Sequence, residues 1–223
     1  MDVKAVVFDL EGTLVDMFDS HVKAFNEVMA RHYNLGFKSQ DLLIGYGMHA
    51  GDIMRIFLRR NGVDCADCTT LVEEKQGILR SKYAGDLKVL PGARQILDAL
   101  RKSGFKIGLA SSSPGRNVEF MLRNPGLRPY FDAVAVAEDV EKAKPNPAVF
   151  LKAAELLGLN PRECVAVEDS VHGVEAAKKA GMMVIGVTTG QGTMEELDAA
   201  GADLIVASLE SLTAEAVASI GFK

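Results

Sequence analysis

Residues 3–13 read VKAVVFDLEGT, an apolar run that ends in two acids, a glycine and a threonine. A short run of valine, alanine and phenylalanine is typical of a strand that is buried on both faces. Asp9, Glu11 and Gly12 follow this predicted strand directly. In a parallel sheet they would lie at the carboxyl edge, where open α/β sheets bind ligands. The stretch therefore predicts a core strand and one corner of a ligand site.

The remainder of the chain from residue 87 alternates apolar runs with segments of helical periodicity. This alternation is typical of a parallel sheet that is covered by crossover helices. We expect buried strands over residues 106–110, 133–137, 164–167 and 183–187. One helix should begin after Pro147 and end at Gly158, and Thr193 with Glu196 should cap another. The sequence thus predicts an α/β fold with a Rossmann-like parallel sheet as its core.

Residues 16–85 interrupt this alternation. Apolar residues recur there at helical spacing in two groups, Val22, Phe25, Val28 and Met29, and Ile53, Ile56, Phe57 and Leu58. No buried strand is evident between them. We expect a small α-helical cap domain over residues 16–85, inserted in a core of residues 1–15 and 86–223. Its joints, near residues 15–16 and 85–91, would let the cap hinge over the sheet edge.

The composition of the chain limits the classes of protein and partner. Of its 223 residues, 48% are hydrophobic and 25% are charged, which is ordinary for a globular protein and excludes a disordered chain. Its 25 lysines and arginines face 30 acids, so we expect no nucleic-acid partner. The start of the chain resembles no targeting peptide, and the apolar runs are far shorter than the roughly twenty residues of a membrane helix. We expect a soluble cytoplasmic protein without a membrane partner; the oligomeric state stays open.

The three cysteines give an odd number, which argues against a disulfide framework. Cys65 and Cys68 have the spacing of metal ligands, but a structural zinc ion needs two more, and no second Cys or His pair follows. We therefore expect two free thiols near a loop. Cys164 lies in an apolar run, where it should be a small buried residue, and all three thiols fit a reducing compartment.

Polar side chains also stand beside the later predicted strands. They are Ser111, Ser112 and Ser113 after the strand at 106–110, Lys144 in EKAKPNPAVF, and Glu168 and Asp169 at the end of CVAVEDS. Because the carboxyl ends of parallel strands meet at one edge, these groups should lie close to Asp9. Carboxylates, hydroxyls and one ammonium group then form a site suited to a metal ion and a phosphate.

The charges of such a site indicate its chemistry. A phosphoryl dianion repels a carboxylate, so attack by Asp9 requires a divalent cation and a further positive group. A few hard oxygen ligands suit Mg²⁺. We expect Asp9 to attack and form an aspartyl-phosphate. Ser111 would then hold phosphoryl oxygens, Lys144 would offset their charge, and Asp169, alone or with Glu168, would complete the metal site.

Taken in order, these motifs resemble those of the haloacid dehalogenase superfamily. The four motifs are DLEGT at residues 9–13, Ser111 after an apolar strand, KPNP at residues 144–147, and EDS at residues 168–170 followed by Gly173. The match spans the core from end to end. It is closest to the subgroup with a helical cap between the first two motifs, which includes phosphoglycolate phosphatases, sugar-phosphate phosphatases and beta-phosphoglucomutase.

The resemblance implies a role for each matching residue. Asp9 is the nucleophile and a magnesium ligand, and the backbone carbonyl of Glu11 and the carboxylate of Asp169 also bind Mg²⁺. Ser111 and Lys144 hold the phosphoryl group. Thr13 and Ser112 join them as candidate phosphate contacts, although a threonine in such a turn more often bonds to the backbone.

Glu11 is the departure from the pattern. Most phosphatases of the family resemble one another in having Asp two residues after the nucleophile, where it protonates the leaving oxygen and then activates water. The extra methylene of Glu11 moves its carboxyl by about 1 Å, a displacement that can cost roughly a hundredfold in rate. Enolase-phosphatases are similar to this chain in carrying Glu there. Dehalogenases lack an acid at this position, so the resemblance favours a phosphatase.

Residues of the predicted cap are candidates for substrate contact. His21 resembles a histidine near the hinge of many subgroup members, where it contacts either the substrate or the domain interface. The loop at residues 44–52 should face the substrate, and its only sizeable side chains are Tyr46, Met48 and His49. Mutases of the beta-phosphoglucomutase kind resemble one another in having an arginine in this loop, where this chain has Met48. Lys75 either reaches the site or lies on a solvated helix face.

We therefore expect a magnesium-dependent phosphatase that acts on small phosphorylated metabolites, with Glu11 activating the water. Two alternatives stay open. One is a phosphotransferase of the beta-phosphoglucomutase type, and the other is a phosphometabolite-binding protein of low turnover. The sequence does not identify the metabolite.

Overall fold

A six-stranded parallel sheet forms the centre of the computed structural model, which describes residues 2–45 and 48–220. The strands are β1 (Ala5–Phe8), β4 (Lys106–Ala110), β5 (Ala133–Ala135), β6 (Cys164–Glu168), β7 (Met183–Val187) and β8 (Leu204–Val206). Their order across the sheet is β5-β4-β1-β6-β7-β8, and every neighbouring pair is parallel. The predicted α/β fold with a parallel core is confirmed.

Strand β1 lies between β4 and β6 and is buried over its whole length. Val6 and Phe8 belong to the hydrophobic cluster on one face of the sheet, and Ala5 and Val7 belong to the cluster on the other. A strand with two covered faces has no polar side, which explains the unbroken apolar run that opens the sequence.

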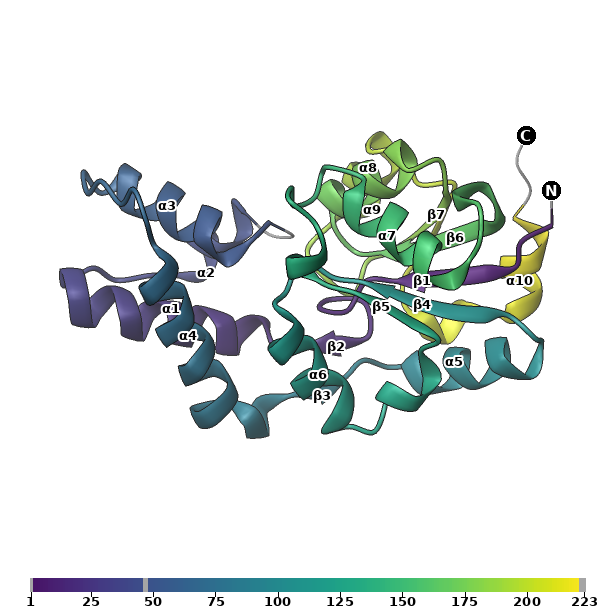
Figure 1. The fold of residues 1–223 in the computed structure, drawn as a ribbon, viewed down its shortest axis with the longest axis horizontal. Coiled ribbons are helices and arrows are strands. Elements are labelled where there is room, and N and C mark those ends of the chain that lie inside the picture. The colour runs from purple at the N-terminus through teal and green to yellow at the C-terminus, as the bar shows by residue number, and fades with distance from the viewer. Residues whose placement is uncertain (1, 46–47, 221–223) are drawn as a thin grey trace.

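Helices cover both faces of this sheet (Figure 1). The helices that pack into the cluster of Val6 and Phe8 are α5 (Ala93–Lys102), α6 (Gly115–Arg123) and α10 (Ala214–Ser219). Those on the other face are α7 (Ala148–Leu157), α8 (Val171–Lys179) and α9 (Met194–Ala199). Short 3-10 helices are η1 (Ala84–Asp86), η2 (Arg128–Tyr130), η3 (Ala137–Asp139), η4 (Pro161–Glu163) and η5 (Leu209–Ser211).

The helix boundaries that the sequence predicts in this core are confirmed. Pro147 precedes α7, and Gly158 ends it in the left-handed region at φ 69°. Thr193 caps α9, because its hydroxyl accepts a hydrogen bond from the backbone N–H of Glu196 (3.2 Å).

The strand predicted over residues 133–137 ends earlier, at Ala135. The carboxylate of Asp139 accepts a hydrogen bond from the backbone N–H of Val136 (2.8 Å) and begins the turn of η3. A local side-chain bond thus takes the backbone N–H of Val136, while the N–H of Ala137 donates to the carbonyl of Ser113 (3.2 Å).

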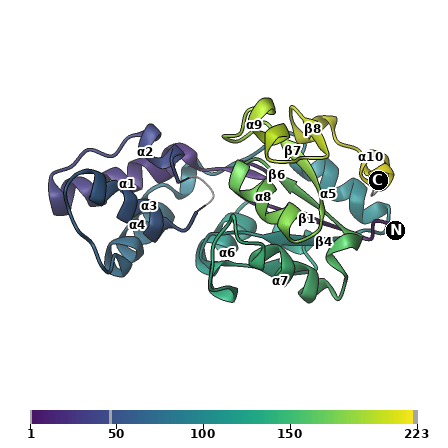
Figure 2. The same cartoon turned by 90° about the horizontal axis from the view of Figure 1, so that it is seen from above.

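A separate helical region lies between β1 and β4, as predicted (Figure 2). It consists of α1 (Phe18–Tyr33), α2 (Ser39–Leu43), α3 (Ala50–Arg60) and α4 (Thr69–Lys82). Its own hydrophobic cluster includes the ring of Phe37, whose centroid lies 4.7 Å from that of Phe25 and 4.9 Å from that of Phe57. The longest described helix is α1, with 16 residues, and none of the described helices is long and apolar enough to cross a bilayer.

The two connections between this helical region and the sheet run side by side. Strand β2 (Val15–Asp16) pairs with the antiparallel strand β3 (Lys88–Val89). The backbone N–H of Leu90 adds a hydrogen bond to the carbonyl of Leu14 (2.9 Å). Both connections lie within the regions that the sequence predicts as joints, and a two-stranded ribbon joins them.

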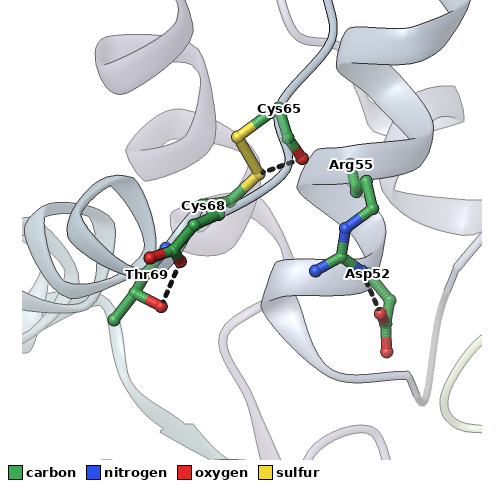
Figure 3. Close-up of a disulfide and its surroundings, with 6 residues drawn as sticks. Asp52, Arg55, Cys65, Cys68 and Thr69 are labelled. Atoms are coloured by element: carbon green, nitrogen blue, oxygen red, sulfur yellow. Dashed lines mark hydrogen bonds and ion pairs between the residues drawn. A yellow bond between two sulfur atoms is a disulfide. The ribbon is translucent and has the colours of Figure 1, made fainter.

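One sequence prediction about the helical region is wrong. Cys65 and Cys68 form a disulfide in the loop between α3 and α4, with their Cα atoms 5.9 Å apart (Figure 3). The prediction relied on the odd number of cysteines, but three cysteines can form one local disulfide and leave the third as a free thiol. Cys164 is free and buried, as expected. The inference from three thiols to a reducing compartment no longer holds.

Candidate active site

One cavity lies where the carboxyl edge of the sheet faces the helical region. Its lining includes five of the predicted site residues from the core, namely Asp9, Glu11, Ser111, Ser112 and Asp169, and His21 from α1. Thr13 and Lys144 stand behind this lining and contact Asp169 and Asp9, respectively. The structure therefore brings together side chains that lie up to 160 positions apart in the sequence, from Asp9 to Asp169, as the strand-end argument predicts.

Lys144 is enclosed by acceptors. Its side chain is 1% exposed, and its Nζ donates to Asp9 Oδ1 (2.6 Å), Glu168 Oε1 (2.5 Å) and the carbonyl of Ala110 (3.1 Å). Burial alone would lower the pKa of Lys144, but the two carboxylates outweigh it and raise the pKa above its ordinary value. Lys144 is thus a permanent buried cation beside Asp9.

Asp9 and Asp169 are both buried carboxylates with a like charge nearby. Burial raises the pKa of each, and the charge of Glu168 raises it further, while Lys144 opposes the shift. Thr13 Oγ1 donates to Asp169 Oδ1 (3.2 Å). One oxygen from each of the three acids lies within 4.8 Å of the others. Such a set of hard oxygen donors fits a divalent cation, which would favour the ionised form of both aspartates.

Glu168 uses both of its oxygens within the protein. Oε1 accepts from Lys144, and Oε2 accepts from the backbone N–H groups of Asp169 (3.0 Å) and Ser170 (3.2 Å) and from the Ser170 hydroxyl (3.1 Å). The Ser170 hydroxyl in turn caps α8 by accepting from the N–H of Gly173 (3.1 Å). Glu168 therefore fixes Lys144 and the turn after β6, and Asp9 and Asp169 are the better candidates for metal ligands.

Two glycines leave room for the acids of this cluster. A Cβ atom at Gly173 would lie 1.9 Å from Cδ of Glu168, and one at Gly190 would lie 1.7 Å from Oδ2 of Asp169. Both distances are impossible, so each carboxylate packs directly on a glycine backbone. The sequence motif included Gly173, but Gly190 belongs to no motif that we recognised.

Gly190→Ala is expected to displace Asp169 and weaken the metal site. In the wild type, Mg²⁺ should raise the melting temperature, because a ligand of the folded state stabilises it. In Gly190→Ala the rise should largely disappear, and overpacking should cost about 1–3 kcal/mol of stability. Thermal denaturation with and without Mg²⁺ measures both effects. Gly36→Ala is the control, since a Cβ there meets nothing within 4 Å, and an equal Mg²⁺ response in all three proteins would contradict the prediction.

Glu11 points its carboxylate at a serine and a histidine. Ser113 Oγ donates to Glu11 Oε2 (2.6 Å), and His21 Nε2 contacts Oε1. Burial would raise the pKa of Glu11, but His21, the bond from Ser113 and the charge of Lys75 lower it to about 2. Glu11 is therefore ionised at neutral pH, and its longer side chain is held by residues from both the core and α1.

Lys75 lies inside the cavity and is not exposed at all, so its interpretation as a solvated residue is wrong. Its Nζ lies 2.5 Å from Nδ1 of His21 and 4.5 Å from the ring centroid of Phe25. Burial lowers the pKa of Lys75 to about 7, although Glu11 partly opposes the shift. The sequence carried one usable signal, because Lys75 lies four residues before the buried Leu79, on the same face of α4.

Sequence reasoning missed a polar bridge between the helical region and the core. Asn117 Nδ2 of α6 donates to Gln76 Oε1 of α4 (2.6 Å), and Arg80 donates to Asn117 Oδ1. Gln76 and Asn117 are both buried. Each has an ordinary polar side chain, so only the tertiary contact distinguishes them from surface residues.

The remaining candidates lie partly elsewhere. His49 precedes α3 and lines a neighbouring hollow that it shares with Ser112 and Pro114, and it is not part of the lining around Asp9. Met48 does line the cavity, and Tyr46 lies outside the described residues. The Ser112 hydroxyl is buried and has no hydrogen-bond partner among the residues that the structure describes, which suits a contact to a ligand.

Comparison with known proteins gives a consistent set of relatives. Residues 6–187 match the family model of haloacid dehalogenase-like hydrolases. The chain is 33% identical over 182 residues to the fructose-1-phosphate phosphatase YqaB of Escherichia coli (strain K12), covering 82% of this chain and 95% of that protein. It is 33% identical over 220 residues to the beta-phosphoglucomutase of Bacillus subtilis (strain 168), covering 96% and 93%. The crystal structure of a beta-phosphoglucomutase from Clostridium difficile is similar with a TM-score of 0.85 and 27% identity, over 96% of this chain and 95% of that one.

Proposed function

The chain belongs to the haloacid dehalogenase-like hydrolase family, and from this membership we propose that it is a magnesium-dependent phosphatase of small phosphorylated metabolites. The observation that carries the proposal is the placement of the Asp9 carboxylate between a buried ammonium and a second aspartate. The relative in Escherichia coli is a fructose-1-phosphate phosphatase, which supports the proposal. We also propose that residues 16–85 act as a cap domain over this site. The cytoplasmic location stays a prediction from the sequence.

In the proposed first step, Asp9 attacks phosphorus. Lys144 binds Oδ1 of Asp9, which leaves Oδ2 as the attacking atom. The new O–P bond forms as the ester O–P bond breaks, and an aspartyl-phosphate results. Ser111 and Ser112 would hold the phosphoryl oxygens, and Lys144 would offset their charge. Asp9, Asp169 and the backbone carbonyl of Glu11 would hold a magnesium ion, whose charge would reduce the repulsion between the carboxylate and the phosphoryl group.

Glu11 is the proposed acid and base. The carboxylate is ionised in the free enzyme, and an incoming phosphoryl anion raises its pKa, so that it can carry a proton to the leaving oxygen. Once the alcohol has departed, the ionised Glu11 takes a proton from the water that attacks the aspartyl-phosphate. Ser113 and His21 position the carboxylate for both transfers.

Glu11→Gln is expected to reduce phosphate release by roughly 10²–10⁴-fold, because an amide transfers no proton. The measurement is phosphate release from a panel of phosphorylated metabolites in Mg²⁺. Glu155→Gln is the control, since Glu155 is exposed on α7 away from the cavity. Full activity of Glu11→Gln would contradict the proposed proton transfer. Absence of release from every metabolite by the wild type would contradict the phosphatase function itself.

A phosphotransferase of the beta-phosphoglucomutase type is the second candidate. It is favoured by the relative of that name, which matches 96% of this chain. The same panel separates the two, since a mutase would interconvert hexose phosphates with little free phosphate. A binding protein of low turnover would instead bind phosphometabolites tightly and release no phosphate.

A further inference from the structure

The end of the cavity that faces the helical region has mostly apolar walls. The side chains there are Phe18, Phe25, Leu42, Met48 and Ile53 from the helical region, and Pro114 from the core. Asp9, Ser111 and Ser112 line the cavity from the core and would hold the phosphoryl group. On the proposed function, the carbon part of the substrate would therefore lie against the apolar end.

Several polar groups at this end already form contacts within the protein. His21 and Ser113 bind Glu11, and Lys75 contacts His21 and donates to Gln76 Oε1 (3.4 Å). Gln76 Oε1 also accepts from Asn117 (2.6 Å). A substrate hydroxyl that enters this end would lose its water and would have to compete with these contacts for a partner.

The charges at this end argue against a second phosphate. Among the described lining residues, Lys75 is the one ammonium, and no arginine lines the cavity. The two undescribed loop positions, 46 and 47, are Tyr and Gly. The arginines of α3, namely Arg55, Arg59 and Arg60, line a separate hollow that shares only Met48 with the cavity. A second phosphate would instead share the cavity with the carboxylate of Glu11.

We propose that the substrate of this enzyme is a monophosphate whose carbon part is poor in hydroxyl groups. This inference rests on the proposed phosphatase function and adds the class of substrate. Burying carbon against apolar walls is favourable, whereas a hydroxyl or a phosphate that enters the same space loses its water and finds few free partners. The site would therefore discriminate against sugar phosphates and bisphosphates.

A three-carbon series tests the proposal at constant chain length. The compounds are n-propyl phosphate, glycerol 1-phosphate and propane-1,3-diol bisphosphate, with p-nitrophenyl phosphate as a general phosphatase substrate. We expect kcat/KM to fall at least about tenfold from propyl phosphate to glycerol 1-phosphate, and at least about tenfold to the bisphosphate. Equal values, or a preference for glycerol 1-phosphate or for the bisphosphate, would overturn the proposal. A preference for the bisphosphate would indicate that the arginines of α3 reach the substrate.

Failure of the underlying function has a different outcome. If none of the four compounds releases phosphate in Mg²⁺, the phosphatase proposal is overturned and the substrate inference with it. If p-nitrophenyl phosphate is hydrolysed and the three-carbon series shows the wrong order, only the substrate inference is overturned.

Met48→Gln tests whether the apolar wall sets the preference. The variant keeps the length of the side chain and adds an amide that can bind a hydroxyl. The ratio of kcat/KM for glycerol 1-phosphate to that for propyl phosphate should rise about fivefold or more, within the range of one added hydrogen bond. Leu43→Gln is the matched control, because Leu43 is 44% exposed on α2 and does not line the cavity. An unchanged ratio in Met48→Gln would overturn the assignment of this wall.

Discussion

Asp9→Asn is expected to abolish phosphate release, with a loss of roughly 10⁴-fold or more, as for other covalent nucleophiles. An amide oxygen is a poor nucleophile, and the variant cannot form the acyl-phosphate. The fold should survive, because the new amide would keep an oxygen that accepts from Lys144 and would remove a charge whose burial is unfavourable. A phosphate-release assay measures the loss of rate. Mass spectrometry of the quenched enzyme detects the aspartyl-phosphate, and only the wild type should carry a phosphoryl group.

The control for this variant is Asp198→Asn, which removes an exposed carboxylate of α9 and should leave the rate unchanged. A melting temperature of Asp9→Asn close to that of the wild type would show that the loss is chemical. If Asp9→Asn released phosphate at the wild-type rate, Asp9 would not be the nucleophile, and a direct attack by water would replace the covalent mechanism.

The parts of the fold and site that the sequence predicts depend on local patterns. β1 is recognisable because both of its faces are covered, so that every residue must be apolar. Asp9, Ser111 and Asp169 follow strands of this kind, and parallel pairing alone brings strand ends to one edge. Lys144 was predicted at the same edge, although in the structure it follows no strand directly, because η3 lies between it and β5.

Other elements escaped prediction because their sequence carries little pattern. Strand β8 has three residues, all only partly buried at the edge of the sheet, which is too short to show an alternation. The ribbon of β2 and β3 has two residues in each strand. The strands exist because the connections to the helical region meet there, which is a tertiary constraint.

The same limit applies to the site. The partners of Glu11 come from α1 and from the loop after β4, and the bridge from Gln76 to Asn117 joins segments 41 positions apart. No local sequence pattern identifies such pairs. The disulfide was missed for a different reason. Cys65 and Cys68 are close in sequence, but the prediction relied on the odd number of cysteines in the whole chain.

Lys144→Met is the second variant with a large expected effect, and this effect is on stability as well as rate. The substitution keeps a long apolar stem but leaves Asp9 and Glu168 buried without their shared cation. Breaking a buried ion pair from one side costs about 3–5 kcal/mol. For a chain of this size, a loss of this magnitude lowers the melting temperature by roughly 10 °C. Thermal denaturation measures it, and Lys142→Met, at an exposed position, is the control.

Mg²⁺ distinguishes an electrostatic cause of this loss of stability from poor packing of the new side chain. If repulsion between carboxylates destabilises Lys144→Met, then Mg²⁺ should raise its melting temperature more than that of the wild type, because the ion neutralises Asp9. Adding Glu168→Gln to Lys144→Met should also recover part of the loss, since it removes one of the two charges. Phosphate release should stay low in all of these variants, because none restores a positive group beside the transferred phosphoryl. A melting temperature of Lys144→Met equal to that of the wild type would show that the buried ammonium is dispensable for the fold.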